Sequence, residues 1–420
     1  MEEKRTRVSF ILADSFEYFI SLFVTGTMLS YLLDTVGFSD SLQGILGTVA
    51  TFTCGASLFA VFLSGKRVKR ICVVGNTINQ LCFVILYLFP LFEFSPKLKT
   101  VLLLTLLLLG HLMNKALFSS RTNMFMCSVP ADKRGIFTAT KEMISLAGGI
   151  TISLVMGRVA DTFRRTDGLP TKKYYVICAV ALLLMTLIHT ASLTTATEKP
   201  IENTKKTSLR DTMKKIITNT TFTKVVVVGL FWNVASAFSV SFFASYLREE
   251  LAFNFTVIAI LTTVGSLARI VASPVMGRIA DKYSFATSMT IAFILAALGF
   301  VAIIFTTPDT RWLYVAYACL HGFGTAGIHS GLINCIYDYV PREDRAIALS
   351  VKNAIGGILT FFTALISGVI MTAIQKNGGF TILGVNLYAQ QVLSFISFIA
   401  VTILIAYMRI VIAPLKKVES

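Results

Sequence analysis

Long apolar segments recur along the whole chain, and they constrain the fold more than any other feature. The run VLLLTLLLLG at 101–110 is one of them. A helix needs roughly 20 apolar residues to cross a bilayer, and lipid offers no partner to an unsatisfied backbone group, so spanning segments are helices or closed barrels. Because these segments have the length of helices, we expect an all-α integral membrane protein.

Composition and motifs exclude several other classes. Of the 420 residues, 55% are hydrophobic and 14% are charged, which leaves too little polar side chain to cover a water-soluble globule. The seven cysteines show no spacing typical of disulfides or a metal site. Neither a Walker loop, an HExxH pair, a nucleophile elbow nor a dinucleotide fingerprint occurs. We therefore expect no enzymatic activity and no cofactor.

Apolar runs and their polar interruptions predict twelve transmembrane helices. The longest polar stretch, 196–221, predicts a cytoplasmic linker between an N-terminal six-helix bundle at 1–195 and a C-terminal six-helix bundle at 222–420. The predicted spans are 8–33, 41–63, 71–92, 98–128, 138–157, 173–194, 222–247, 255–276, 285–306, 312–340, 346–374 and 386–411.

The net charge of +16 is distributed as in a multi-pass protein of the cell (inner or plasma) membrane. With both termini cytoplasmic, the cytoplasmic segments and adjoining helix ends hold 25 of the 38 Lys and Arg residues, and external loops hold 10. Residues 158–173, with five basic residues on the external side, are the exception. The basic charge is thus expected to set topology, and no nucleic-acid partner is expected.

The two halves of the chain repeat one another. Residues 123–141 align with 334–352 at a constant offset of 211, and Asn, Val-Pro, Arg and Lys coincide. A duplicated unit of six helices is typical of one transporter architecture, in which the halves are related by an axis along the membrane normal.

Two short loops resemble the signature of a known family. GRIADKY at 277–283 is similar to the major facilitator superfamily signature Gly-x-x-x-Asp-Arg/Lys, with Gly277 and Asp281 at the defining positions. The corresponding loop GKRVKR at 65–70 keeps Gly65 but lacks the Asp. The resemblance implies the fold of that superfamily, two pseudo-symmetric six-helix bundles with twelve helices in all.

The signature loop also suggests a gating contact. A glycine at a helix end allows a tight exit, and Asp281 can face helix N-terminal amides and a nearby basic residue. We predict a pair between Asp281 and Arg345, made in one orientation of the halves and lost in the other. A helix cap combined with positive-inside charge explains the same residues equally well.

Ionisable residues fall inside the first and fourth predicted spans. Such groups cost a few kcal/mol in a bilayer and are functional candidates by default. Side chains at equal depth in the membrane are expected to pair, which matches Asp14 with Arg121 and Glu17 with Lys115. The resemblance implies that these helices line the central cavity. Proton coupling or substrate contact is one interpretation, and a static buried ion-pair network is the other. The candidates here are Asp14, Glu17, His111, Asn114, Lys115 and Arg121.

The second half offers mainly hydrogen-bonding groups. Its candidates for solute binding are Trp232, Asn233, Arg269, His329 and Asn334. For the histidines a core position is the favoured interpretation, and Arg269 has no acidic partner in its own helix.

These features together predict a secondary active transporter that moves a small polar solute by alternating access, in symport with H⁺ rather than Na⁺. A proton-driven exporter of amphipathic compounds is the alternative, and a non-transporting sensor or membrane enzyme is disfavoured. The expected partners are the solute, the coupling ion and the lipid bilayer, and the family resemblance implies a monomer.

Overall fold

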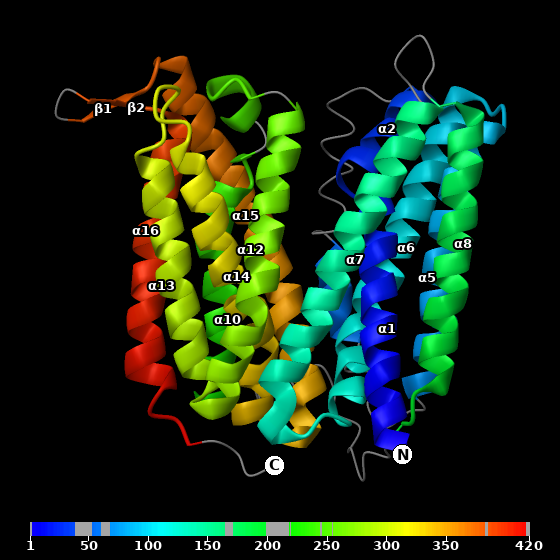
Figure 1. Cartoon of the computed structure of the whole chain (residues 1–420), viewed down its shortest axis with the longest axis horizontal. Helices are drawn as coiled ribbons and strands as arrows, with labels where there is room; N and C mark the ends of the chain where they lie inside the picture. The colour runs from blue at the N-terminus through cyan, green and yellow to red at the C-terminus, as the bar shows by residue number, and fades with distance from the viewer. Residues whose placement is uncertain are drawn as a thin grey trace. The chain divides into compact units, whose positions relative to one another are not determined.

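The chain folds into two compact units, each built from long helices (Figure 1). The computed structural model describes residues 2–37, 53–59, 68–163, 171–198, 218, 220–243, 246–253, 255–382 and 385–416. The first unit comprises Met1–Val129 and Ile144–Thr212, and the second comprises Pro130–Met143 and Met213–Ser420. The helix that begins at Arg134 therefore contributes its first ten residues to the second unit and the rest to the first.

The first unit has an aromatic core. Phe23, Tyr87, Tyr174 and Tyr175 are fully buried there, and the hydroxyl of Tyr87 donates to the carbonyl oxygen of Phe23 at 2.6 Å. A buried phenol needs such an acceptor, which fixes the ring within the apolar cluster. The elements are α1 (Glu2–Phe23), α2 (Gly26–Val36), η1 (Thr53–Phe59), α5 (Val68–Leu88), η2 (Phe89–Leu91), α6 (Pro96–Met126), most of α7 (Arg134–Thr162) and α8 (Lys172–Thr195).

Among the residues that the structure describes, the second unit contains six long helices and a small β-hairpin that the sequence did not predict. In the hairpin Phe380 pairs with Leu387 in antiparallel register. The elements are η3 (Ala131–Lys133), α10 (Thr220–Val240), η4 (Tyr246–Glu250), α12 (Phe255–Lys282), α13 (Phe285–Ile304), α14 (Leu313–Tyr339), η5 (Arg342–Asp344), α15 (Arg345–Lys376), β1 (Phe380–Ile382), β2 (Val385–Leu387), α16 (Ala389–Tyr407) and η6 (Met408–Ile412).

The single helix predicted at 8–33 is wrong, because α1 and α2 are separate. Ser21 and Thr25 donate their hydroxyl protons to the carbonyl oxygens of Tyr18 and Ser21 at 2.7 and 2.8 Å. Such hydroxyls compete with the backbone for helix carbonyls and weaken the helix where Gly26 follows. Most of the span predicted at 41–63, and residues 199–217 of the predicted linker, lie outside the described residues.

Within the described ranges, nine helices are long and apolar enough to cross a membrane. The long helices α1 and α14 are not among them. Both nevertheless carry polar residues that the sequence analysis identified as candidates, since Asp14 and Glu17 lie on α1 and His329 lies on α14. The predicted total of twelve spans stays a prediction.

Small residues bring α13 and α14 into close contact. A Cβ atom added at Gly324 would lie 2.7 Å from the carbonyl oxygen of Ala292, and one added at Gly327 would lie 2.7 Å from the Cβ of Ala292. Lipid provides no hydrophobic drive for helices to associate, so helix contacts in membranes depend on this kind of close packing.

Replacing Gly324 with valine is expected to destabilise the protein by about 1–3 kcal/mol, since the new side chain meets backbone that cannot yield. The control is Gly157→Val on α7, where an added Cβ has nothing within 4 Å. Thermal unfolding in detergent should show a lower midpoint for Gly324→Val only. Equal midpoints for the two variants would mean that the α13–α14 contact does not limit stability.

Candidate functional site

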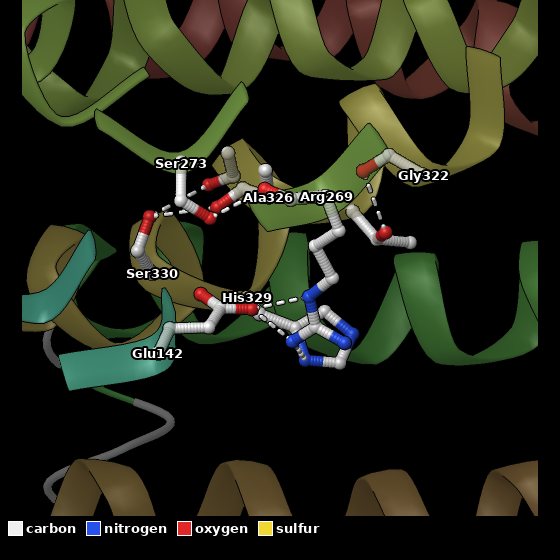
Figure 2. A network of polar contacts seen from close by, with 9 residues as sticks. Glu142, Arg269, Ser273, Gly322, Ala326, His329 and Ser330 are labelled. Atoms are coloured by element: carbon white, nitrogen blue, oxygen red, sulfur yellow. Dashed lines mark hydrogen bonds and ion pairs between the residues drawn. The ribbon is translucent and has the colours of Figure 1, made fainter. Parts of the chain in front are cut away.

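Three residues of the second unit, each from a different helix, form a polar cluster. Arg269 of α12 forms an ion pair with Glu142 of α7, to which its Nε donates. Its Nη2 donates to Nδ1 of His329 on α14 at 3.0 Å, and Figure 2 shows Arg269 reaching toward both partners. Arginine has no acceptor atom, so Nδ1 of His329 is the acceptor and the ring carries its proton on Nε2.

The local packing brings these three helices together. Glycines let α12 and α14 approach closely, since a Cβ added at Gly322 would lie 3.0 Å from the Cβ of Ala268. Ser273 donates to the carbonyl oxygen of Arg269 at 2.8 Å, and this bond is also drawn in Figure 2. The side chains of Arg269 and Glu142 are 22% and 12% exposed. An uncompensated charge at such a place in a bilayer costs a few kcal/mol, and the pair removes most of that cost.

A second charged cluster lies in the first unit. Glu17 of α1 forms an ion pair with Arg121 of α6, and the two side chains are 15% and 3% exposed. Arg121 also donates from Nη1 to Oδ1 of Asn76 on α5, whose amide nitrogen donates to the carbonyl oxygen of Cys72 at 2.8 Å. The guanidinium therefore joins three helices, as Arg269 does in the second unit.

The predicted pairing of Glu17 with Lys115 is wrong, because Glu17 pairs with Arg121. Asp14 and Glu17 are only three residues apart, which is about 4.5 Å along a helix axis. That difference is smaller than the reach of an arginine side chain. Membrane depths inferred from the sequence therefore do not determine which of the two acids pairs with Arg121. Asn76, which the sequence analysis did not consider, helps to hold the guanidinium in place.

Asp281 binds the beginning of α7. Its two carboxylate oxygens accept from the backbone nitrogens of Gly135 and Ile136 at 2.7 and 2.8 Å. These amides belong to the first turn, where the helix leaves N–H groups without partners and where a negative charge is favourable by about 0.3–2 kcal/mol. The amide contact that the signature loop predicted is present.

The pair between Asp281 and Arg345, expected in only one orientation of the halves, stays a prediction, whereas the helix end expected at Gly277 is wrong. In this structure Arg345 donates to the carbonyl oxygens of Val340 and Tyr337 at 3.1 and 2.9 Å, because its guanidinium folds back on the turn before α15. Gly277 does not end a helix, since α12 continues to Lys282. It lies where α12 crosses α7, and a Cβ added to it would be 2.8 Å from the carbonyl oxygen of Gly135. Gly65 lies outside the described residues.

The chain resembles solved transporter structures along almost its whole length. A bacterial homologue of the iron transporter ferroportin, in an outward-facing state, is 14% identical with a TM-score of 0.71, and 97% of this chain and 98% of that one are covered. The fucose:proton symporter of Escherichia coli is 10% identical with a TM-score of 0.71, and the covered shares are 97% and 99%.

In sequence, residues 226–412 match the family model of the Major Facilitator Superfamily. This match covers most of the second half of the chain, and the likeness to the solved transporters shows a shared fold over almost its whole length. A search of curated proteins finds no significant match to the chain.

Two of the predicted site residues hold helices of the second unit together. Asn334 is fully buried, and its amide donates to Oγ1 of Thr138 at 3.0 Å and to the carbonyl oxygen of Ser330 at 2.9 Å. Trp232 is buried, with its ring centroid 5.5 Å from that of Phe293 and 6.5 Å from that of His321. Both are better explained as packing residues of the second unit.

The remaining candidates lie along the same helices. His111 is buried on α6, with its ring centroid 5.4 Å from that of Phe83. Asn114 and Lys115 are half-buried one turn further along α6. Asn233 is half-buried on α10, beside Gly356 of α15. A role for these residues in transport stays a prediction.

Sequence reasoning missed Glu142 and Asn76. Glu142 lies inside the predicted span 138–157, and an acid inside a span was the signal that identified Glu17. Asn76 is neutral, so the cost of a charge in the bilayer does not identify it. Within the described ranges, no group of three or more His, Cys, Asp or Glu side chains is placed to hold a metal ion.

The ion pair of the first unit makes a stability prediction. Glu17→Leu alone leaves the guanidinium of Arg121 buried without its carboxylate, so it is expected to destabilise the protein by about 3–5 kcal/mol. The double variant Glu17→Leu/Arg121→Met removes both charges and is expected to recover most of this loss. Thermal unfolding midpoints in detergent compare the two. A double variant as unstable as the single one would contradict this account.

Proposed function

We propose that this protein is a secondary active transporter that moves a small polar solute by alternating access, in symport with H⁺. The observation that supports the proposal is the cluster of Glu142, Arg269 and His329, in which a carboxylate and an imidazole nitrogen compete for one guanidinium. Both groups can take up a proton, and they lie on two helices, α7 and α14, that are linked through Arg269.

Protonation acts on this cluster in one direction. When Glu142 takes a proton, its charge is lost and its attraction to Arg269 falls. When His329 takes a proton on Nδ1, that atom becomes a donor and can no longer accept from Arg269. A proton arriving at either residue therefore weakens the link between α7 on one side and α12 with α14 on the other.

The weakened link offers a route from proton binding to helix movement. A ligand shifts a conformational equilibrium only by as much as it binds the two states differently. A proton that is bound strongly when the Arg269 contacts are open, and weakly when they are closed, satisfies this requirement. The comparison with the Escherichia coli fucose:proton symporter supports H⁺ as the coupling ion at the level of the fold.

Transport assays in proteoliposomes test the proposal. The probe is a panel of radiolabelled sugars, amino acids, nucleosides and organic acids, offered with an inward proton gradient. Glu142→Gln keeps the shape of the side chain but cannot change its charge, so gradient-driven accumulation of the transported solute is expected to fall at least tenfold. Exchange of that solute in the absence of a gradient is expected to persist.

Asp309→Asn is the matched control, since Asp309 is an exposed carboxylate in the segment between α13 and α14. Accumulation in this variant should equal that of the parent protein. Accumulation that survives Glu142→Gln unchanged would overturn the coupling role of the cluster. Uptake of no solute in the panel would instead favour a protein that senses rather than transports.

A further inference from the structure

The side chain of Lys352 extends across a glycine of a neighbouring helix in the second unit. This lysine lies on α15, two turns after the helix begins at Arg345, and it is half-buried. Its side chain crosses α10 at Gly229, where an added Cβ would lie 2.8 Å from both Cγ and Cδ of the lysine. The same position is 3.6 Å from Cδ2 of Leu332 on α14. A side chain at position 229 would displace the lysine from this path.

The ammonium group of Lys352 has no counter-charge from the part of the chain that the structure describes. Neither an ion pair nor a hydrogen bond involves it there. The other two clusters behave differently, because Arg121 has Glu17 and Arg269 has Glu142. A lone ammonium within a spanning helix costs a few kcal/mol. Such a cost is tolerated most readily where an anion from outside the chain compensates it.

Other donors lie in the same region. Lys352 passes beside Leu332 at Gly229, and Leu332 lies three residues after His329, on the same face of α14. Arg269 reaches the same histidine from α12. His329 is exposed, and because its Nδ1 accepts from Arg269, its Nε2–H remains as a donor. Glu142 neutralises Arg269, so the group formed by Glu142, Arg269, Lys352 and neutral His329 keeps one net positive charge.

We propose that Lys352 and Nε2 of His329 bind the anionic group of the transported solute, and that this group is a carboxylate with a single negative charge. The inference rests on the proposed transport function and names its substrate class. The ammonium supplies the charge, and the imidazole N–H supplies a directed hydrogen bond to the second carboxylate oxygen.

The charge of the cluster selects among anions. A monoanionic carboxylate cancels the single net positive charge, whereas a dianionic phosphate leaves one negative charge uncompensated in a low-dielectric site. An amphipathic cation, as an exporter of such compounds would carry, is repelled by Lys352 and Arg269. The site is thus expected to bind monoanionic carboxylates and to reject the amphipathic cations that an exporter would carry.

Ligand binding to the purified protein in detergent, without any gradient, tests this proposal. The probes are acetate, lactate and gluconate, each paired with its own amide, together with inorganic phosphate. At least one carboxylate is expected to raise the thermal unfolding midpoint, while its amide does not. Lys352→Met is expected to weaken that carboxylate at least tenfold in the midpoint titration, and Lys352→Arg, which keeps the charge, is expected to retain most of the affinity.

Lys376→Met is the control, since it removes an exposed lysine from the far end of the same helix. It should bind as the parent does, and size-exclusion elution of each variant shows that it is folded. The proposal is overturned if no carboxylate binds, if the amide or phosphate alone binds, or if Lys352→Met binds as tightly as the parent.

The design also separates this inference from the proposed function. Binding in detergent involves no proton gradient, so intact carboxylate binding together with failed accumulation would remove the transport proposal alone. Gradient-driven uptake of a neutral solute that does not respond to Lys352→Met would remove the carboxylate site alone.

Discussion

A charge inside a bilayer has no water to solvate it, and much of this structure follows from that constraint. Each half of the chain contains an arginine within a long helix, and each arginine is matched by a glutamate from a different helix. Arg121 and Glu17 are 104 residues apart, and Arg269 and Glu142 are 127 residues apart, so the pairs join distant segments. Packing of apolar surface favours many helix arrangements in lipid, but these charges are satisfied in few of them.

Three polar contacts lie on one face of α7, near the beginning of the helix. Gly135, Thr138 and Glu142 follow one another at intervals of three and four residues, which places them on one side of the helix. They contact Asp281, Asn334 and Arg269 in turn. Asn334 and Thr138 carry no titratable group, whereas Asp281 and Glu142 are carboxylates. A proton can therefore weaken the first and the third of these contacts but not the second.

The sequence predicted the class of fold well, but it predicted poorly which ionisable side chains pair with each other. Apolar runs and the repeat at an offset of 211 residues depend on composition and order alone, and the match of residues 226–412 to the superfamily model agrees with them. Pairings depend on the angle and depth at which two helices cross. Asp14 and Glu17 are three positions apart, which is less than one helical turn, and no sequence pattern resolves that distance. Arg269 was recognised as a candidate, but its partner lies on α7, in the other half of the sequence.

The crossing of α7 and α12 has a consequence for how variants of this protein should be interpreted. Gly135 and Gly277 place two backbones against each other, and the Asp281 carboxylate reaches the α7 amides at 2.7 and 2.8 Å beside that crossing. A methyl group at either glycine would push the helices apart by more than a hydrogen bond tolerates. A change of size at an uncharged residue would then be felt as the loss of a charge contact, and electrostatic and steric lesions at this crossing would share one phenotype.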